Sequence, residues 1–407
     1  MSTRPIPDFE RLGNCRHLDT INRKNLDFER EKLCLVCCKH SDVYACLVCG
    51  KYFHGKSRSL QSHAFIHSVK SRHYVYVNMK TAKFYCLIDG CQVNHSSLDD
   101  IRQALNPRFS RDRVLQLDRN VQWLKALNGS HYLPGMVGLR NMEADFVNVT
   151  IQSLMRVTPL RNFFLFPENY VHTKSEVVQR FGELTRKIWH APNFKGQVSP
   201  FEFSKAVRRE FGKSDPVEFT SWLLKTLHNG LQNPNRRSNI ICDCFKGEVQ
   251  FAGNTDGRSR KGFLMLGLDL PALPVSMDSN IIPEVPLFDI LKDCPRVTKL
   301  PRYLILHMRR FTKNSLSSVQ EKNPTLVNFP LKNLELKDYI IPSRLCVPSK
   351  YELIANIVHD GKPSSYTVFV QQKSEQLWYQ IRDLHVVRTP SQTVASSEAY
   401  MLIYEWQ

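Results

Sequence analysis

Residues 300–311 read LPRYLILHMRRF, and residues 399–405, near the end of the chain, read AYMLIYE. Both stretches are short, rich in apolar and aromatic side chains and free of glycine, which is the composition of buried β-strands. Further runs of this kind fill the second half of the chain. The predicted strands are 239–251, 262–269, 302–311, 351–359, 365–371, 377–382 and 399–405.

The residues before these strands predict helices, because their apolar side chains recur at intervals of three and four. Ser199-Pro200 and Asp215-Pro216 are typical helix starts, since proline suits the first helical turn. The predicted helices are 147–157, 175–190, 200–211 and 216–230. Helices followed by strands in one stretch indicate an α+β fold.

Composition divides the 407 residues into three regions. Residues 13–95 hold most of the cysteines, and residues 96–130 read as connecting helices, with Asn128-Gly129 closing the second one. Residues 131–407 form the α+β domain. With 42% hydrophobic residues, the chain has ample material for buried cores.

The net charge and the hydropathy exclude some classes of protein. Lysine and arginine outnumber aspartate and glutamate by 56 to 38, a net charge of +18, which favours surroundings rich in nucleic acid. No run approaches the roughly 18 apolar residues of a membrane span, and the first 15 residues do not resemble a signal peptide. We therefore expect neither a secreted nor a membrane-bound protein.

Eight of the twelve cysteines and seven of the fourteen histidines lie before residue 96. In a reducing compartment such a cluster indicates metal rather than disulfides. Cys34-x2-Cys37 and Cys46-x2-Cys49 are two knuckles that can each place two thiolates on one Zn²⁺. The remaining ligands could come from four histidines, and a further site could form between Cys15-x-His17 and Cys86-x4-Cys91. The four histidines are His54, His63, His67 and His73.

This pattern resembles the zinc finger of ubiquitin-specific-protease type, in which Cys-x-His opens the domain and a helix carries His-x3-His. The resemblance implies two to three structural zinc ions. Their ligand sets would be Cys34, Cys37, His54 and His63; Cys46, Cys49, His67 and His73; and Cys15, His17, Cys86 and Cys91.

Many members of that family bind the C-terminal carboxylate of ubiquitin with an arginine and stacked aromatic residues. Here Lys56 replaces the arginine, and Tyr44 and Tyr85 replace tryptophans. Lysine lacks the bidentate fork that suits a carboxylate, which argues against ubiquitin-tail binding.

The remainder of the chain resembles the ubiquitin-specific protease domain, a papain-like fold with thumb, palm and fingers. Residues 138–154 correspond to its nucleophile box, and residues 214–219 (SDPVEF) to its QDAxEF helix start. Residues 300–311 are close to its LPxxLxLHLKRF signature, and residues 399–404 match its closing strand. The paired CxxC ribbon of its fingers is absent, which predicts fingers without metal.

The catalytic positions of that family do not match. A thiol protease needs a cysteine nucleophile, a histidine base and a residue that orients the histidine. The resemblance places Asp145 at the nucleophile position, Ser365 at the base and Arg382 at the orienting position. Cys242 and Cys244 alternate on a predicted strand, where they would serve packing. We therefore predict that the domain is inactive as a thiol protease.

The combination of such a zinc finger with a protease domain that lacks its triad resembles one family: the ubiquitin-protease-like splicing factors that assemble and maintain the spliceosomal tri-snRNP. The resemblance implies a nuclear, non-catalytic scaffold that binds snRNP proteins, with basic surface within reach of snRNA phosphates. Two alternatives stay open from the residues alone, a ubiquitin-binding adaptor and a deubiquitinase with an unusual nucleophile.

Overall fold

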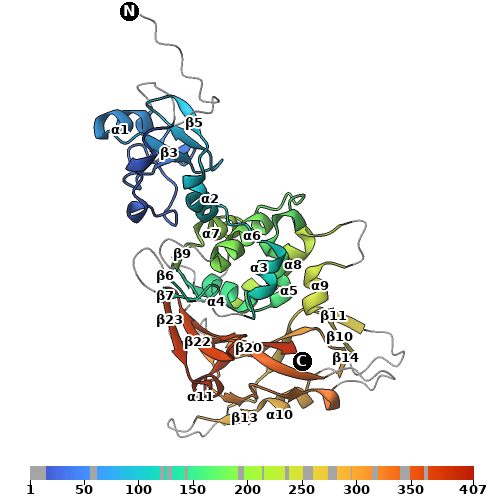
Figure 1. Cartoon of the computed structure of the whole chain (residues 1–407). Coiled ribbons are helices and arrows are strands. Elements are labelled where there is room, and N and C mark those ends of the chain that lie inside the picture. Colours follow the sequence, from blue (N-terminus) through green and yellow to red (C-terminus); the bar gives the residue numbers. More distant parts are fainter. Residues whose placement is uncertain are drawn as a thin grey trace, which may run out of the picture. The chain divides into compact units, whose positions relative to one another are not determined.

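The computed structural model describes most of the chain as two compact units (Figure 1). The described residues are 15–55, 62–119, 123–125, 131–142, 145–190, 197–212, 215–233, 238–250, 260–273, 282–294, 296–313, 320–339, 349–361 and 365–407. Among them, no helix is both long and apolar enough to cross a membrane.

The first unit comprises Met1–Arg108, Gln122–Val137 and Arg186–Ser199. It is built on an antiparallel sheet with the strand order β2-β1-β3-β4-β5. The strands are β1 (Val43–Cys46), β2 (Tyr52–His54), β3 (Val75–Asn78), β4 (Phe84–Cys86) and β5 (Cys91–Val93), and the helices of this part are η1 (Leu18–Thr20), η2 (Arg23–Asn25), α1 (His63–Ser71), η3 (Ser96–Leu98) and α2 (Asp99–Leu105).

The sheet of the first unit is buried on both faces. Successive side chains of a strand point to opposite sides, and all four residues of β1 and of β3 are buried. On β1, Val43 and Ala45 join one core cluster, whereas Tyr44 joins the other, to which Ala64 of α1 also belongs. The sheet thus lies between residues 15–28 with α2 on one face and α1 on the other.

Residues outside the cysteine-rich region complete this unit. Glu29, which is largely buried, accepts hydrogen bonds from Lys187 (3.2 Å) and from the backbone N–H of Ser199 (2.8 Å). The short strands β6 (Leu124–Lys125) and β7 (His131–Tyr132) pair within the same unit.

The second unit comprises Phe109–Val121, Gly138–Thr185 and Pro200–Gln407. The four predicted helices are confirmed, with shifts at their ends. Its helices are α3 (Arg111–Gln116), α4 (Asp145–Leu154), α5 (Thr158–Leu165), η4 (Pro167–Asn169), α6 (Glu176–Trp189, whose last turn groups with the first unit), α7 (Phe201–Arg208), α8 (Pro216–Gly230), α9 (Ile240–Phe245), α10 (Leu287–Lys292), η5 (Lys337–Tyr339) and α11 (Ser391–Ala395).

Two sequence predictions about secondary structure are wrong. The second connecting helix ends at Gln116 instead of running on to Asn128-Gly129, and Leu124–Lys125 is a strand; residues 126–130 lie outside the described part. The predicted strand 239–251 is α9 followed by β10 (Gly247–Gln250).

The sheet of the second unit has the strand order β12-β15-β24-β20-β21-β22-β23, with β19 on β20. Among the described strands of this sheet, β12 and β15 pair in parallel and the other neighbours are antiparallel. Its strands are β12 (Leu266–Asp269), β15 (Tyr303–Arg309), β19 (Leu334–Glu335), β20 (Lys350–His359), β21 (Tyr366–Gln372), β22 (Leu377–Arg382), β23 (His385–Thr389) and β24 (Ala399–Trp406). Smaller strands of this unit are β8 (Gly138–Leu139), β10, β11 (Arg260–Phe263), β13 (Glu284–Pro286), β14 (Arg296–Lys299), β16 (Phe311–Lys313), β17 (Gln320–Lys322) and β18 (Leu326–Asn328). Strand β9 (Gln197–Val198) belongs to the first unit.

Residues 300–311 and 399–405 lie side by side in this sheet, because β15 pairs with β24. The guanidinium of Arg310, directly after β15, is fully buried and donates to the carbonyl oxygens of Ala399 (2.7 Å), Asn323 (3.0 Å) and Thr325 (2.7 Å). These hydrogen bonds offset part of the free-energy cost of burying the guanidinium charge of Arg310.

Helices cover both faces of the large sheet (Figure 1). Leu402 and Tyr404 of β24 join a core cluster with residues of α10 and α11. The alternate residues face the other side, and α4 packs on β20, β21 and β22. The nine residues of α4 from Phe146 to Leu154 are all buried, so this helix is fixed in place.

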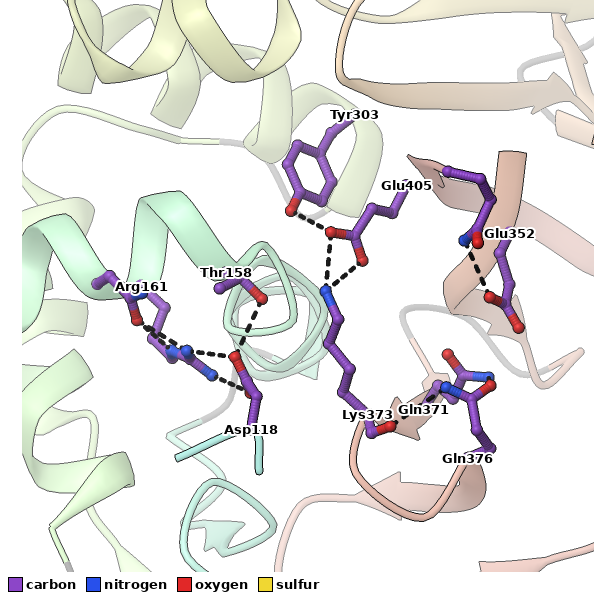
Figure 2. A network of polar contacts seen from close by, with 11 residues as sticks. Asp118, Thr158, Arg161, Tyr303, Glu352, Gln371, Lys373, Gln376 and Glu405 are labelled. Atoms are coloured by element: carbon purple, nitrogen blue, oxygen red, sulfur yellow. Dashed lines mark hydrogen bonds and ion pairs between the residues drawn. The ribbon is translucent and has the colours of Figure 1, made fainter. Parts of the chain in front are cut away.

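A polar network runs between the helices and the sheet of the second unit (Figure 2). Asp118 receives two hydrogen bonds from the buried guanidinium of Arg161, at 2.7 and 2.8 Å. Close by, Glu405 of β24 accepts from Lys373 (2.9 Å) and from the hydroxyl of Tyr303 (2.7 Å). The Asp118–Arg161 pair joins the turn after α3 to helix α5, and the contacts of Glu405 join strand β24 to β15 and to Lys373, which follows β21.

Candidate metal centres and catalytic positions

The structure gathers Cys46, Cys49, His67 and His73 so that their ligand atoms all lie within 4.8 Å of one another. The Sγ of Cys49 is 3.4 Å from Nε2 of His67, which is 3.3 Å from Nδ1 of His73. Ligands that surround one zinc tetrahedrally at bond lengths of 2.0–2.3 Å are about 3.3–3.8 Å apart. All four residues are the set that the sequence proposed for one zinc.

A strand end and a helix position two of these ligands. Strand β1 ends at Cys46, and His67 lies on α1. The other ring nitrogen of His67 lies 3.1 Å from the Ser71 hydroxyl, a contact that fixes the orientation of a metal-binding imidazole. The pKa of Cys49 falls to about 4, chiefly through its hydrogen bond with Cys46, so this thiol is poised to bind as thiolate.

A second group consists of Cys34, Cys37 and His63, with the Sγ of Cys34 at 3.4 Å from Nδ1 of His63. Burial raises the pKa of Cys34, but backbone N–H groups, including that of Val36 at 3.4 Å, outweigh it and lower the pKa to about 7. The ring of His54 lies beside that of His63, with centroids 6.4 Å apart, but its nitrogens are not part of the group.

The third group is Cys15, His17, Cys86 and Asp89. The sequence named the first three of these residues together with Cys91, which lies outside the group. Asp89 is the ligand candidate that sequence reasoning missed, although Cys86-x2-Asp89 has the same spacing as the two CxxC knuckles.

The positions that hold a ubiquitin tail in related zinc fingers are occupied differently here. Tyr44 and Tyr85 are 2% and 3% exposed and pack edge to face with ring centroids 5.7 Å apart. Lys56 lies outside the described residues. The two aromatic rings are therefore part of the core and have no free face for a ligand.

Two of the three residues that the resemblance places at catalytic positions touch each other. Ser365 directly precedes β21, and Arg382 ends β22, which pairs with β21. The guanidinium of Arg382 donates to the Ser365 hydroxyl at 3.0 Å and lies 3.6 Å from the carboxylate of Asp360. Neither group can take a proton from a nucleophile at neutral pH.

The third position, Asp145, begins α4. Asn141 donates to Asp145 and to Asp383 (2.9 Å), and Asn148 of α4 donates to the other oxygen of Asp383 at 2.8 Å. Asp383 sits in the turn between β22 and β23 with φ +49°. The side-chain amides thus tie the start of α4 to that turn.

The charges around Asp145 oppose acyl transfer. Burial raises the pKa of Asp145, against the hydrogen bond from Asn141, and the charge of Asp383 raises it further. A carboxylate at the nucleophile position would repel a developing oxyanion, which needs hydrogen-bond donors.

A thiol and an imidazole do meet elsewhere. The Sγ of Cys242 lies 3.5 Å from Nδ1 of His228, because α9 is a helix and brings Cys242 against α8. The predicted strand over 239–251 gave no reason to expect this contact. The one sequence signal for a helix here is Asn239, a residue type that favours the N-cap position.

The hydrogen bonds of Asn239 bear on which ring nitrogen of His228 carries the proton. Its amide nitrogen donates to the carbonyl of His228 (2.9 Å), and its Oδ1 accepts from the N–H of Ile241 (3.2 Å) and Cys242 (3.3 Å). Oδ1 also lies 3.2 Å from Nδ1 of His228, which favours the tautomer with the proton on Nδ1. In that tautomer Nδ1 does not accept the thiol proton of Cys242.

Two known families match these two units. Residues 34–98 match the family described as Zn-finger in ubiquitin-hydrolases and other protein, and residues 137–404 match the family described as ubiquitin carboxyl-terminal hydrolase. The chain belongs to the ubiquitin carboxyl-terminal hydrolase family. The predicted fold is confirmed: a small zinc-finger domain is followed by the α+β fold of a ubiquitin-specific protease.

Several proteins are similar over nearly the whole chain, and two of them, from yeasts, carry splicing names. Human ubiquitin carboxyl-terminal hydrolase 39 is 40% identical, over 97% of this chain and 80% of that protein. The probable mRNA-splicing protein ubp10 of Schizosaccharomyces pombe is 35% identical, over 96% of this chain and 88% of that protein. The pre-mRNA-splicing factor SAD1 of Saccharomyces cerevisiae is 28% identical, over 97% and 94%.

Solved structures of family members agree. A structure described as an essential yeast splicing factor superposes with a TM-score of 0.82 at 28% identity, covering 96% of this chain and 99% of that one. The Ubp8 module of yeast SAGA gives 0.57 at 20% identity, over 95% and 90%, and shares the fold.

Proposed function

We propose that this protein is a non-catalytic pre-mRNA splicing factor, a scaffold for assembly and maintenance of the spliceosomal tri-snRNP in the nucleus. The observation that carries the proposal is the pairing of a complete protease fold with a polar network at its catalytic positions. Similarity over nearly the whole chain to two yeast proteins with splicing names, and to the solved structure of an essential yeast splicing factor, supplies the process.

The absence of catalysis follows from the side chains at the three positions. Asp145, Ser365 and Arg382 provide neither a thiol nor an imidazole there, and Arg382 donates to Ser365. The Cys242–His228 contact supplies no alternative in the tautomer that Asn239 favours, because the facing nitrogen of His228 is then a donor. A ubiquitin-based electrophilic probe should leave every cysteine unlabelled.

The zinc finger would serve the scaffold structurally. Cys46, Cys49, His67 and His73 would hold one zinc, and Cys34, Cys37 and His63, with His54 as fourth ligand, would hold another. Closed four-coordinate sites contribute directly to folding, which a module with small cores needs.

The partners would be snRNP proteins docked on the surface of the protease-like unit. The net charge of +18 also favours contact with the phosphates of snRNA. Ubiquitin is not the expected partner, because Tyr44 and Tyr85 are buried against each other.

The test is affinity purification of the tagged protein from nuclear extract over a series of salt concentrations, with identification of the bound proteins and RNA. Phosphate contacts weaken steeply as salt rises, so specific docking should persist where RNA adsorption has vanished. Depletion should lower tri-snRNP levels and intron removal. If no snRNP protein co-purifies and splicing is unchanged on depletion, the splicing role is wrong.

A further inference from the structure

We propose that the third zinc site takes an oxygen ligand, Asp89, and that Cys91 does not bind the metal. The site is then Cys15, His17, Cys86 and Asp89, two thiolates, one imidazole and one carboxylate. The inference rests on the zinc assignment of the proposed function, and it is independent of the splicing role.

The distances within the group fit one tetrahedral ion. The Sγ of Cys86 is 3.1 Å from Oδ2 of Asp89 and 3.4 Å from Nδ1 of His17, and Oδ2 of Asp89 is 3.4 Å from the same Nδ1. The Sγ of Cys15 is 3.8 Å from that Nδ1. Oxygen, nitrogen and sulfur atoms bound to one zinc at 2.0–2.3 Å are about this far apart.

A second observation is that three turns of the finger repeat one backbone geometry. In the first, the N–H of Cys38 donates to the carbonyl of Cys34 at 2.9 Å. In the second, Gly50 donates in the same way to Cys46, also at 2.9 Å. The donors Cys38 and Gly50 have φ values of +54° and +72°.

The third turn has the same form. Gly90, with φ +66°, donates to the carbonyl of Cys86 at 2.9 Å. In the first two turns the ligands are the first residue and the residue three further on, directly before the left-handed one. In the third turn that position is Asp89, so the repeated turn aims its side chain at the metal.

The same comparison removes Cys91. In the first two turns, the residue five positions after the first cysteine is a lysine whose carbonyl accepts from that cysteine's N–H; these are Lys39 (3.0 Å) and Lys51 (2.9 Å). Cys91 holds the equivalent place, because it is the strand partner of Cys86 where β4 pairs with β5. Its thiol lies outside the group of four ligand atoms.

An oxygen ligand changes what the site is. Carboxylate is a harder donor than thiolate. Because Asp89 takes the place of a third cysteine, the site has one thiolate fewer than a Cys₃His site. It also joins the start of the module, through Cys15 and His17, to the hairpin of β4 and β5. With Asp89 as its fourth ligand, the third site holds two thiolates, as each of the other two groups does.

The experiment compares Asp89→Ala with Cys91→Ser, a matched pair two residues apart in one hairpin, in the full chain purified with its zinc. Zinc per chain is measured by elemental analysis. We expect Asp89→Ala to lose one zinc relative to the parent and Cys91→Ser to lose none. Loss of zinc from Cys91→Ser, or retention of all zinc by Asp89→Ala, would overturn the proposal.

Cobalt substitution gives a second readout that does not depend on stability. The thiolate-to-cobalt absorption grows with the number of bound thiolates, and the three groups contain six cysteines. Cys91→Ser should leave this absorption unchanged, and Asp89→Cys should raise it by about one sixth. A fall in Cys91→Ser contradicts the inference, whereas a parent without any zinc contradicts the zinc assignment itself.

Discussion

Asp145 is a carboxylate whose pKa is raised in the folded protein, first by burial and then by the charge of Asp383. Between the unfolded and the folded pKa the folded state binds more protons, so stability falls as pH rises through this range. Asp145→Asn should therefore raise the melting temperature at pH 7, by a few degrees at most, and the gain should vanish below about pH 4.

Thermal unfolding followed by circular dichroism from pH 3 to 8 measures this difference. The exposed residue Glu210 supplies a control, since Glu210→Gln should give no comparable pH-dependent gain. A gain for Asp145→Asn that stays constant down to pH 3 would show that ionisation of Asp145 is not its cause.

Restoring the nucleophile alone should not restore activity. In Asp145→Cys, Ser365 and Arg382 still offer neither a base nor a residue that could orient one, so the new thiol would lack the proton acceptor that a thiol protease uses. We expect a small alkylating reagent to modify position 145, which is partly exposed, whereas a ubiquitin-based probe leaves it unmodified. Mass spectrometry of both reactions decides, and a probe adduct at position 145 would mean that ubiquitin binds and the site supports attack.

At the scale of residues, spacing alone predicted the ligands that follow a repeated cysteine motif. It passed over Asp89 because carboxylates are common, and the Cys86-x2-Asp89 spacing becomes telling only once the turn is seen to repeat that of the two knuckles. The catalytic positions could be located because their flanking motifs survive, but the bonds of Asn141 and Asn148 to Asp383 join residues more than 230 positions apart. No local pattern contains such contacts.

At the scale of elements, α9 shows why short apolar runs mislead. Residues 240–245 are as apolar as a strand, but Asn239 caps their first turn and Ile241, Cys244 and Phe245 lie on one buried face. The intervals of three and four between them are helical. A six-residue run is too short for either period to dominate, and the packing against α5 and α8 decides.

The turn after α3 and helix α5 are joined by Asp118 and Arg161. Arg161 is 2% exposed, so Asp118→Asn would leave a buried cation without its charge partner, at a cost of about 3 kcal/mol. Although burial raises the pKa of Asp118, Arg161 lowers it below its usual value. Its contribution to stability is therefore present above the unfolded pKa and is lost as pH falls through the folded one.

Urea unfolding of Asp118→Asn at pH 7 and at pH 3 measures this contribution. The exposed pair of Arg309 and Asp269 is the matched control, and Asp269→Asn should cost less than about 1 kcal/mol. Equal effects of the two substitutions would show that burial of Arg161 does not make its ion pair important.

At the scale of the whole molecule, composition can divide a chain only into consecutive stretches. The structure groups residues 122–137 and 186–199 with the zinc-binding sheet. Glu29 explains part of this grouping, because its carboxylate accepts bonds from Lys187 and Ser199. The sequence shows these residues as ordinary charged and polar positions, since their partners lie more than 150 residues away.

The two units have separate cores, so removing zinc should unfold one and spare the other. A chelator should leave the amides of β1, β3 and β4 open to hydrogen exchange, because the metal supplies much of the free energy of folding of that small sheet. The amides of β20 and β24 should stay protected, because their core cluster draws on α10, α11 and the large sheet.

Hydrogen exchange read by mass spectrometry, with and without chelator, measures both units in one sample. Cys34→Ser should reproduce the effect of the chelator, and Cys38→Ser should not, because Cys38 is exposed and lies outside the three ligand groups. If β20 and β24 lost protection together with β1, folding of the protease-like unit would depend on the zinc-binding unit. The scaffold would then be a single cooperative structure, and a chelator would abolish all docking at once.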